Sequence, residues 1–335
     1  MAISTNALTM AQYAIMSNTP LVQAVTNSLI DNGSILARDI PFVPKQTLIA
    51  NGVRWEGSLP TVGWSQINAE GLSASGTPTP YQEQAYIIRN VIDVDKFLVM
   101  DQNQIADPRA TQLGAYLQAV SYDFNYKFFK NDHVTGDANA IVGLRYRIDN
   151  GSLYGVRSEN KIDAAGADIT AAATAATFGS AVEFLDQALW SVGSVDGSNV
   201  VLYMDSKVMR RLDRLARQFA GQGGFSQAVD QLGRSVLKYK NADLRDPGVK
   251  ADQSTHILTV TEAATGLDAS STYTSVYAVN YGDGKFGGWQ MQDLKATDIG
   301  MLEAGSTYRT LVDWAGGLIN QSNRSIARVY DLKYS

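Results

Sequence analysis

The segment from Gln104 to Asp132 constrains the fold of this chain more than any other. Asp107 followed by Pro108 is a strong helix start, because the Asp side chain accepts from the free amides of the first turn and Pro at the first helical position loses no hydrogen bond. Beyond this start, apolar residues recur at helical spacing and fall on one face. These residues are Leu113, Leu117, Val120, Phe124 and Phe128. The sequence therefore predicts one helix over 108–131, roughly 36 Å long.

The composition is that of a folded protein and excludes several kinds of active site. The chain has 335 residues, of which 45% are hydrophobic and 18% are charged, so it is long enough for two domains. The absence of cysteine excludes disulfides, thiolate metal sites and a cysteine nucleophile. The two histidines, His133 and His256, are far apart in the sequence, so no histidine-rich metal site and no cofactor is expected.

Net charge and hydropathy restrict the partners. A net charge of −5 argues against a protein whose main task is gripping nucleic acid, since phosphate contacts need a surplus of Lys and Arg. It does not argue against enclosing nucleic acid without sequence-specific binding. No stretch approaches 18 uninterrupted apolar residues, so no membrane span is predicted.

Residues 46–85 have the pattern of a β-hairpin that leaves the body of the protein and returns. Strand-like pieces at 53–56 and 61–67 are broken by glycine and proline, and a turn-prone tail follows at 71–80. A lone two-stranded hairpin is marginal in water. This one carries the large apolar residues Trp55, Leu59, Trp64 and Ile67, which we expect a partner surface to cover. The alternative is a loop that lies on its own domain.

The remainder of the chain mixes strands and helices. A strand is predicted within 84–100, two short strands at 141–148 and 151–156 joined by a turn at 149–151, and a helix over 178–192. Residues 198–300 form an alternating α/β unit. Its predicted strands lie at 200–204, 235–239, 256–260 and 275–280, and its helix at 207–219. Two last strands, at 307–314 and 325–330, are separated by Ala315, Gly316 and Gly317.

The motifs that could carry chemistry are weak. Residues 282–287 fit the dinucleotide pattern G-x-G-x-x-G, but that pattern needs a following helix, and a strand-like segment follows here. We therefore interpret Asp283 and Gly284 as a hairpin turn. No pair of carboxylates stands at a spacing that predicts a general acid and base, so an enzyme is not expected.

One run of basic residues has several possible roles. Arg210, Arg214 and Arg217 share a face of the predicted helix 207–219. They could bind phosphate, form salt bridges between subunits, or simply be solvated. Asp213 lies in the same run and weakens an anion-binding role.

In order, these elements resemble a tailed-bacteriophage major capsid protein of the Hong Kong 97 type, an α+β fold. The resemblance rests on the loop 46–85 returning through 86–93 and on the long helix opened by Asp107 and Pro108. It continues through the helix 178–192 and the strand 199–205. The last matching segments are 298–303, 308–314 and 324–328.

The resemblance implies a division of the chain into domains. An N-terminal arm would occupy 1–45 and an extended β-hairpin loop 46–85. A peripheral domain with the long spine helix would follow at 86–197, and an α/β axial domain at 198–305. Residues 306–335 would return to the peripheral domain as C-terminal strands.

The implied function is structural. Hexamers and pentamers of this chain would form the icosahedral head shell around a double-stranded DNA phage genome. The implied partners are further copies of the chain, a portal, a possible decoration protein and a separate scaffolding protein. We expect the scaffolding protein to be separate because no long helical segment precedes the arm. Assembly would take place in the host cytoplasm, and the protein would reside in the virion.

One departure from some relatives concerns crosslinking, and two other functions remain open. Some relatives join subunits covalently through a lysine of the extended loop, but no lysine lies between Gln46 and Lys96. The nearest alternative is an encapsulin-like nanocompartment shell that holds enzymes. A soluble α/β enzyme, or a sugar-binding module rich in Tyr and Trp, is a different class, which a stable monomer would favour.

Overall fold

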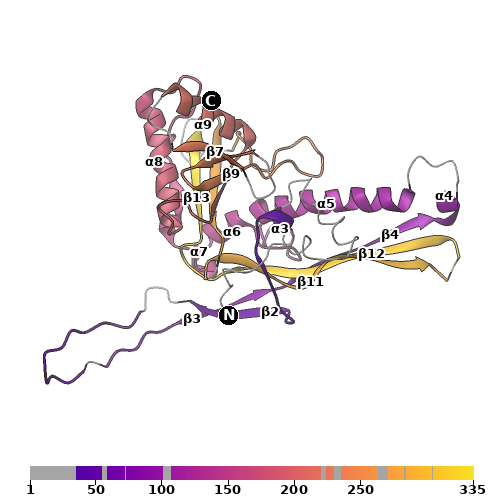
Figure 1. Ribbon diagram of the computed structural model, residues 1–335, viewed down its shortest axis with the longest axis horizontal. Coiled ribbons are helices and arrows are strands. Elements are labelled where there is room, and N and C mark those ends of the chain that lie inside the picture. The colour runs from indigo at the N-terminus through magenta and orange to yellow at the C-terminus, as the bar shows by residue number, and fades with distance from the viewer. Residues whose placement is uncertain are drawn as a thin grey trace.

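Two β-sheets and the long helix between them organise the molecule. The computed structural model describes residues 35–54, 59–71, 73–100, 107–219, 224–229, 235–262, 271–282, 284–303 and 305–335. Figure 1 shows the long helix α5 lying above a long sheet, with a second sheet and two further helices at one end. A hairpin extends away from the body on the side opposite to α5.

The first sheet is four-stranded, in the order β1-β11-β12-β4. Its strands are β1 (Phe42–Pro44), β11 (Phe286–Met301), β12 (Thr307–Asn320) and β4 (Tyr86–Asp95). Within β4, Tyr86, Ile88, Ile92 and Val94 are buried or half-buried, and every odd-numbered residue from 87 to 95 is exposed, as a strand with one covered face requires. The covered face is the one that packs against α5.

The helix α5 spans Pro108–Lys130 and starts where the sequence predicts. The Asp107 carboxylate accepts from the Arg109 amide, and Pro108 occupies the first turn. Of the predicted face, Leu117, Val120, Phe124 and Phe128 are buried, and Leu113 is half-buried at the end farther from the second sheet.

The second sheet is seven-stranded, in the order β5-β13-β10-β6-β9-β8-β7. Its strands are β5 (Lys161–Asp163), β13 (Ile326–Lys333), β10 (Tyr273–Asn280), β6 (Val200–Tyr203), β9 (Ala242–Arg245), β8 (Ser235–Tyr239) and β7 (Phe225–Val229). Its central strand β6 is buried at every position. Such an unbroken apolar run is what a strand covered on both faces needs.

The two faces of this sheet are covered by different helices. Val200 and Leu202 pack with α8 (Ala175–Ser191) and α9 (Ser206–Gln218). Val201 and Tyr203 point the other way, into the core that α5 completes. Phe129 of α5 lies 5.2 Å from the Tyr203 ring, measured between centroids. The end of α5 therefore plugs the face of the sheet that α8 and α9 leave open.

Several short elements complete the described chain. They are the helices α3 (Ile35–Arg38), α4 (Lys96–Met100), α6 (Leu144–Asp149) and α7 (Gly151–Tyr154), the 3-10 turn η1 (Ser158–Asn160), and the hairpin strands β2 (Ile49–Arg54) and β3 (Thr79–Gln84).

The predicted strands at 141–148 and 151–156 are wrong, because this region forms the helices α6 and α7. Leu144 and Ile148 are both buried and lie one helical turn apart, a spacing that the turn signal at 149–151 concealed. The turn itself exists, but it joins two helices. Likewise, the chain after Asp95 forms α4 and does not extend the strand to residue 100.

Two further predictions about strands are corrected. Residues 256–260 form only an isolated bridge between His256 and Val249. The strand β12 does not stop at Trp314 but continues through Gly316 and Gly317. These glycines allow close packing, since a Cβ on Gly316 would lie 2.6 Å from the Trp314 ring.

The segment 282–287 turns, but it does not close a hairpin. β10 belongs to the seven-stranded sheet and β11 to the four-stranded sheet, so the two strands that flank the turn do not pair. Gly284 has a φ of 68°, which glycine adopts without strain. Asp283 lies outside the described residues. Strand β11 follows the turn, so the helix N-terminus that pyrophosphate binding requires is missing here.

The elements group around the two sheets in a way that cuts across the chain order. α8 packs on β13, and both lie with the seven-stranded sheet. β11 lies in the four-stranded sheet, beside β12 and below α5. Which of these two bodies acts as a peripheral or an axial domain stays a prediction.

Candidate assembly surfaces

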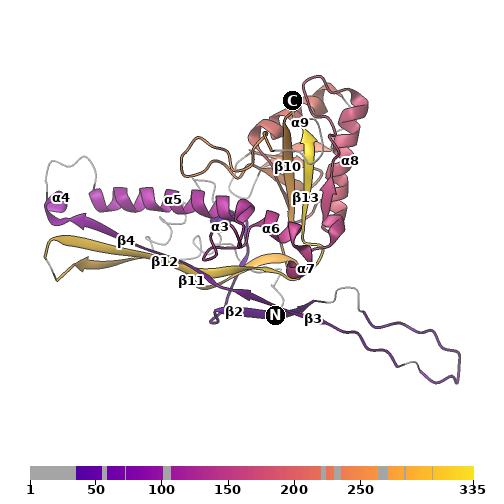
Figure 2. The ribbon, with the colours of Figure 1, turned by 180° about the vertical axis from the view of Figure 1, so that it is seen from behind.

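The extended hairpin is the most exposed apolar part of the described chain. β2 and β3 pair antiparallel from Ile49 opposite Gln84 to Arg54 opposite Thr79. Both views show the chain beyond this ladder running far from the body (Figures 1 and 2). The exposed fractions are 71% for Leu59, 96% for Trp64 and 94% for Ile67.

The hairpin tip therefore exposes large apolar side chains to solvent in the single subunit. Trp64 and Ile67 have almost no cover from their own chain, which contradicts the alternative of a loop lying on its own domain. Trp55, the fourth predicted contact residue, lies outside the described residues. Apolar side chains held this far from the core are typical of an interaction site.

The root of the hairpin, in contrast, is fixed firmly to the body. Glu83 of β3 forms a two-point ion pair with Arg147 of α6, at 2.6 and 3.1 Å. On the neighbouring strand, the Arg54 Nε donates to the Asn320 carbonyl at 2.9 Å, and its guanidinium lies 4.0 Å from the centre of the Tyr81 ring. Both strands of the hairpin are therefore held by buried arginine contacts.

Both partners of the ion pair between Arg147 and Glu83 are buried. The Arg147 side chain has no exposed surface, and Glu83 is 6% exposed. Burial alone would lower the pKa of Arg147, but the facing Glu83 carboxylate raises it above its ordinary value. Arg147 Nε also donates to the Val142 carbonyl, so all three guanidinium nitrogens have an acceptor. Loss of either partner would leave the other charge buried without compensation, which strongly destabilises the fold.

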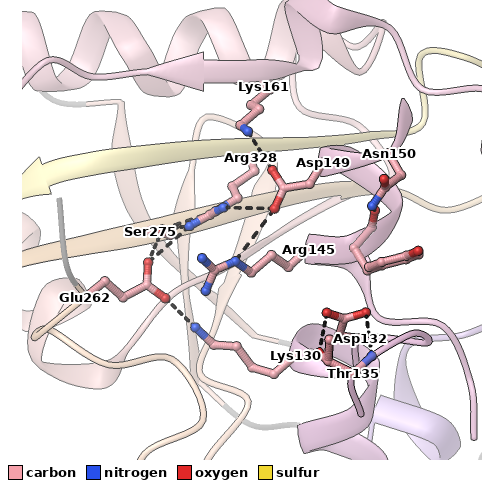
Figure 3. Close-up of polar contacts among 11 residues, drawn as sticks. Lys130, Asp132, Thr135, Arg145, Asp149, Asn150, Lys161, Glu262, Ser275 and Arg328 are labelled. Atoms are coloured by element: carbon pink, nitrogen blue, oxygen red, sulfur yellow. Dashed lines mark hydrogen bonds and ion pairs between the residues drawn. The ribbon is translucent and has the colours of Figure 1, made fainter. Parts of the chain in front are cut away.

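A second polar cluster joins α5 to the seven-stranded sheet. Figure 3 shows Glu262 between Lys130 at the end of α5, Ser275 of β10 and Arg328 of β13. Arg328 also donates to Ser275 at 3.0 Å. We call Lys130, Glu262, Ser275 and Arg328 the joint, because these side chains connect the two bodies of the molecule.

The joint continues onto α6. Asp149 lies 2.7 Å from the Lys161 ammonium and 4.0 Å from the Arg328 guanidinium, and Arg145 approaches it at 3.7 Å (Figure 3). Cations therefore outnumber carboxylates around Glu262. Burial would raise the pKa of Glu262, but Lys130 and Arg328 together lower it below the ordinary 4.5. Glu262 is thus ionised at neutral pH.

The predicted basic residues do share an exposed face. Lys207, Arg210, Arg214 and Arg217 are all exposed on α9, whose opposite face buries Val208, Leu212 and Leu215. The Asp205 carboxylate caps the helix by accepting from the Lys207 amide. Arg217 pairs with Asp213 at 2.5 Å.

Sequence reasoning missed the buried ion pairs of both the root and the joint. Glu83 and Arg147 lie 64 residues apart in the chain, and Lys130 and Glu262 lie 132 apart, so no local pattern connects them. One signal existed for Arg147. It lies between Leu144 and Ile148 on the same helical face, which marks it as buried once the segment is treated as a helix.

The described residues offer little sign of other site types. Within them, no group of three or more His, Asp or Glu side chains is placed to hold a metal ion. In the same residues, every helix is too short or too polar to cross a membrane.

Comparisons with known proteins identify the fold. No protein-family model and no curated protein sequence matches the chain. A chain of the holo-SrpI encapsulin complex from Synechococcus elongatus PCC 7942 is 12% identical, covers 96% of both chains and has a TM-score of 0.55. The capsid of a native GTA particle is 12% identical over 91% of this chain and 90% of that chain, with a TM-score of 0.56. A chain of Microbacterium phage Oxtober96 is 13% identical over 87% and 88%, at 0.52.

Proposed function

Because this chain has the Hong Kong 97-like capsid fold, we propose that it is a major capsid protein of a tailed phage. Hexamers and pentamers of the chain build an icosahedral head shell around a double-stranded DNA genome. The protein has a structural role and no enzymatic one. It assembles in the host cytoplasm and resides in the virion.

The observation that carries this proposal is the contrast between the two ends of the hairpin. Its root is fixed by Glu83 and Arg147, while Trp64 at its tip is 96% exposed. An apolar tip that its own chain leaves exposed gains stability only when another molecule covers it. In a closed symmetric assembly, every copy both offers a tip and covers one, so the exposed surface disappears throughout.

We assign the two bodies of the molecule to the two domains of the fold. The four-stranded sheet with α5 acts as the peripheral domain, and the seven-stranded sheet with α8 and α9 acts as the axial domain. This assignment moves α8 and β13 to the axial side and β11 to the peripheral side, following the sheet to which each belongs or on which it packs. The segment 46–85 remains the extended loop and 1–45 the arm.

The proposed partners follow from the shell. They are further copies of this chain, a separate scaffolding protein and a portal, and a decoration protein is a further candidate. Covalent crosslinking through the extended loop is not part of the proposal, because the loop contains no lysine.

An encapsulin-like nanocompartment is the second candidate, favoured by the likeness to the holo-SrpI encapsulin complex over 96% of both chains. Such a shell would enclose proteins instead of DNA. The contents of purified particles distinguish the two: protected double-stranded DNA of phage origin supports the phage shell, and a co-purifying enzyme in particles without DNA supports the nanocompartment.

The direct test is negative-stain electron microscopy of the full chain, expressed alone and together with its neighbouring genes. We expect hollow polyhedral particles, or hexamer and pentamer rings, in at least one condition. A uniform monomer in both conditions would overturn the proposal and favour a soluble enzyme or binding module.

A further inference from the structure

The exposed face of α9 has a concentration of positive charge that the fold does not use. The basic residues of this helix are Lys207, Arg210, Arg211, Arg214 and Arg217, and within the helix the only acidic residue is Asp213. This stands out in a chain whose net charge is −5. We call Lys207, Arg210, Arg214 and Arg217 the basic ridge.

Among the residues that the structure describes, most of the ridge has no ionic partner. Arg217 pairs with Asp213, and the half-buried Arg211 packs 5.0 Å from the centre of the Tyr334 ring. In the described part of the chain, Lys207, Arg210 and Arg214 form no ion pair with a carboxylate. Arg210 donates only to the Ser206 carbonyl, at 3.3 Å. These cations are therefore free to meet an anion from outside.

The ridge lacks what a protein partner normally requires. Protein interfaces are centred on buried apolar or aromatic anchors, and charged residues are depleted at their centre. None of the large apolar side chains that the described chain exposes lies on α9. Its apolar residues Val208, Leu212 and Leu215 are buried against the sheet, and Met209 and Ala216 are half-buried in the same core. A surface of this kind fits a polyanion better than it fits an amphipathic helix.

The spacing and chemistry of the ridge match a phosphate backbone. Cβ atoms three or four positions apart on a helix are about 5–6 Å apart, and each DNA strand carries one phosphate charge per about 3.4 Å of helix axis. At this spacing the long Lys and Arg side chains can each meet a separate phosphate. Three of the four ridge residues are arginines, whose planar fork binds phosphate oxygens at two points. A row of such donors binds without reading base sequence.

We propose that the basic ridge of α9 contacts the phosphate backbone of double-stranded DNA, and that this helix is where the shell meets the genome it encloses. The inference rests on the proposed capsid function and adds to it a specific contact surface. The contact is sequence-independent, and the acidic remainder of the chain keeps the overall interaction weak.

The test measures binding of a 30-base-pair DNA duplex to the full-length protein before it forms closed particles, over a series of salt concentrations. Arg210→Gln combined with Arg214→Gln should make the slope of log affinity against log salt shallower by about 1.8 for each chain in contact, because each lost phosphate contact removes about 0.9. Arg210→Lys with Arg214→Lys should keep the slope and weaken binding. The matched control, Arg89→Gln with Lys295→Gln, removes the same charge from exposed positions on β4 and β11 and should leave the slope unchanged.

Several outcomes would overturn the inference. One is a wild-type chain that shows no salt-dependent DNA binding, and another is a ridge variant with the wild-type slope. Preferential capture of poly-glutamate over DNA would assign the ridge to an acidic protein segment instead. Electron microscopy of the same preparations separates this failure from that of the shell. If particles form but the ridge variant keeps the wild-type slope, only the proposed contact between the ridge and DNA is wrong. If the wild-type chain forms neither particles nor rings, the proposed capsid function is wrong, and the genome contact that rests on it is wrong as well.

Discussion

Arg147 and Glu83 form a buried two-point ion pair, at 2.6 and 3.1 Å, that ties the helix α6 to the extended hairpin. Arg147→Ala should lower the free energy of unfolding by about 3–5 kcal/mol, because it leaves the Glu83 carboxylate buried without a partner. Denaturant unfolding of the full chain measures the loss.

The matched variant replaces both partners. Arg147→Met with Glu83→Leu removes both charges and fills the space with apolar atoms, so it should recover most of the stability lost in the single variant. A single variant within about 0.5 kcal/mol of wild type would show that the pair is not needed for folding.

The joint should make the protein sensitive to acid. The pKa of Glu262 is lowered below 4.5 in the folded protein, so its contribution to stability is fully present above the ordinary pKa and is lost as the pH falls through the folded value. Thermal unfolding should therefore show a loss of stability below about pH 4.5.

Glu262→Gln tests this assignment. The variant should be less stable at pH 7 by about 3–5 kcal/mol, because Lys130 and Arg328 lose their shared carboxylate, and its stability should depend less on pH in the acid range. Glu183→Gln, at an exposed position of α8, is the control and should match wild type. Parallel pH profiles for wild type and Glu262→Gln would contradict the role of Glu262.

The tip of the hairpin should matter for assembly and not for folding. Trp64→Ala should reduce the yield of particles while changing the free energy of unfolding by no more than about 0.5 kcal/mol, since the side chain is 96% exposed in the subunit. Particle yield by sedimentation, with unfolding measured on the same preparation, separates the two effects. Wild-type yield from this variant would mean that no neighbour covers Trp64.

Phe128→Ala provides the opposite case. Phe128 is fully buried where α5 meets both sheets, so its truncation should destabilise the subunit by about 3–5 kcal/mol before assembly begins. If Phe128→Ala and Trp64→Ala changed the unfolding free energy equally, the distinction between core and assembly surface would fail.

Particles of this protein should come apart completely on a denaturing gel. The extended loop contains no lysine, so the amine needed for a side-chain crosslink from this loop is missing. Boiled particles should run as a single band near 36.3 kDa. A ladder of higher bands would show that a covalent link forms by another route.

The sequence predicts the long periodic elements and misses the contacts between distant segments. The position of α5, α9 and β6 follows from apolar spacing and from the capping residues Asp107 and Asp205, which act locally. The sequence predicts a strand where α6 forms, because six residues contain too few turns to establish a helical period. The continuation of β12 through Gly316 and Gly317 depends on the neighbouring Trp289, which only the folded sheet places there.

The candidate assembly surfaces also differ in whether the sequence alone predicts them. The apolar tip of the hairpin is visible in the sequence because nothing in its own segment can bury Trp64 and Ile67. The root and the joint are not visible, because ion pairs such as Arg147 with Glu83 form between segments that meet only after folding. The basic ridge is visible as a pattern, but whether its members meet a carboxylate is decided by the fold: among the described residues, Lys207, Arg210 and Arg214 do not, and Arg217 does.

The short helix α6 gives the subunit a direct mechanical path between two distant contacts. Arg147 on this helix holds the hairpin, and Asp149 on the same helix contacts Arg328 of the joint. A rotation of so short a helix moves both side chains at once. We therefore expect a neighbour that pulls on the hairpin to change the angle between the two bodies of the subunit, which would let one chain adapt its shape to rings of five or six.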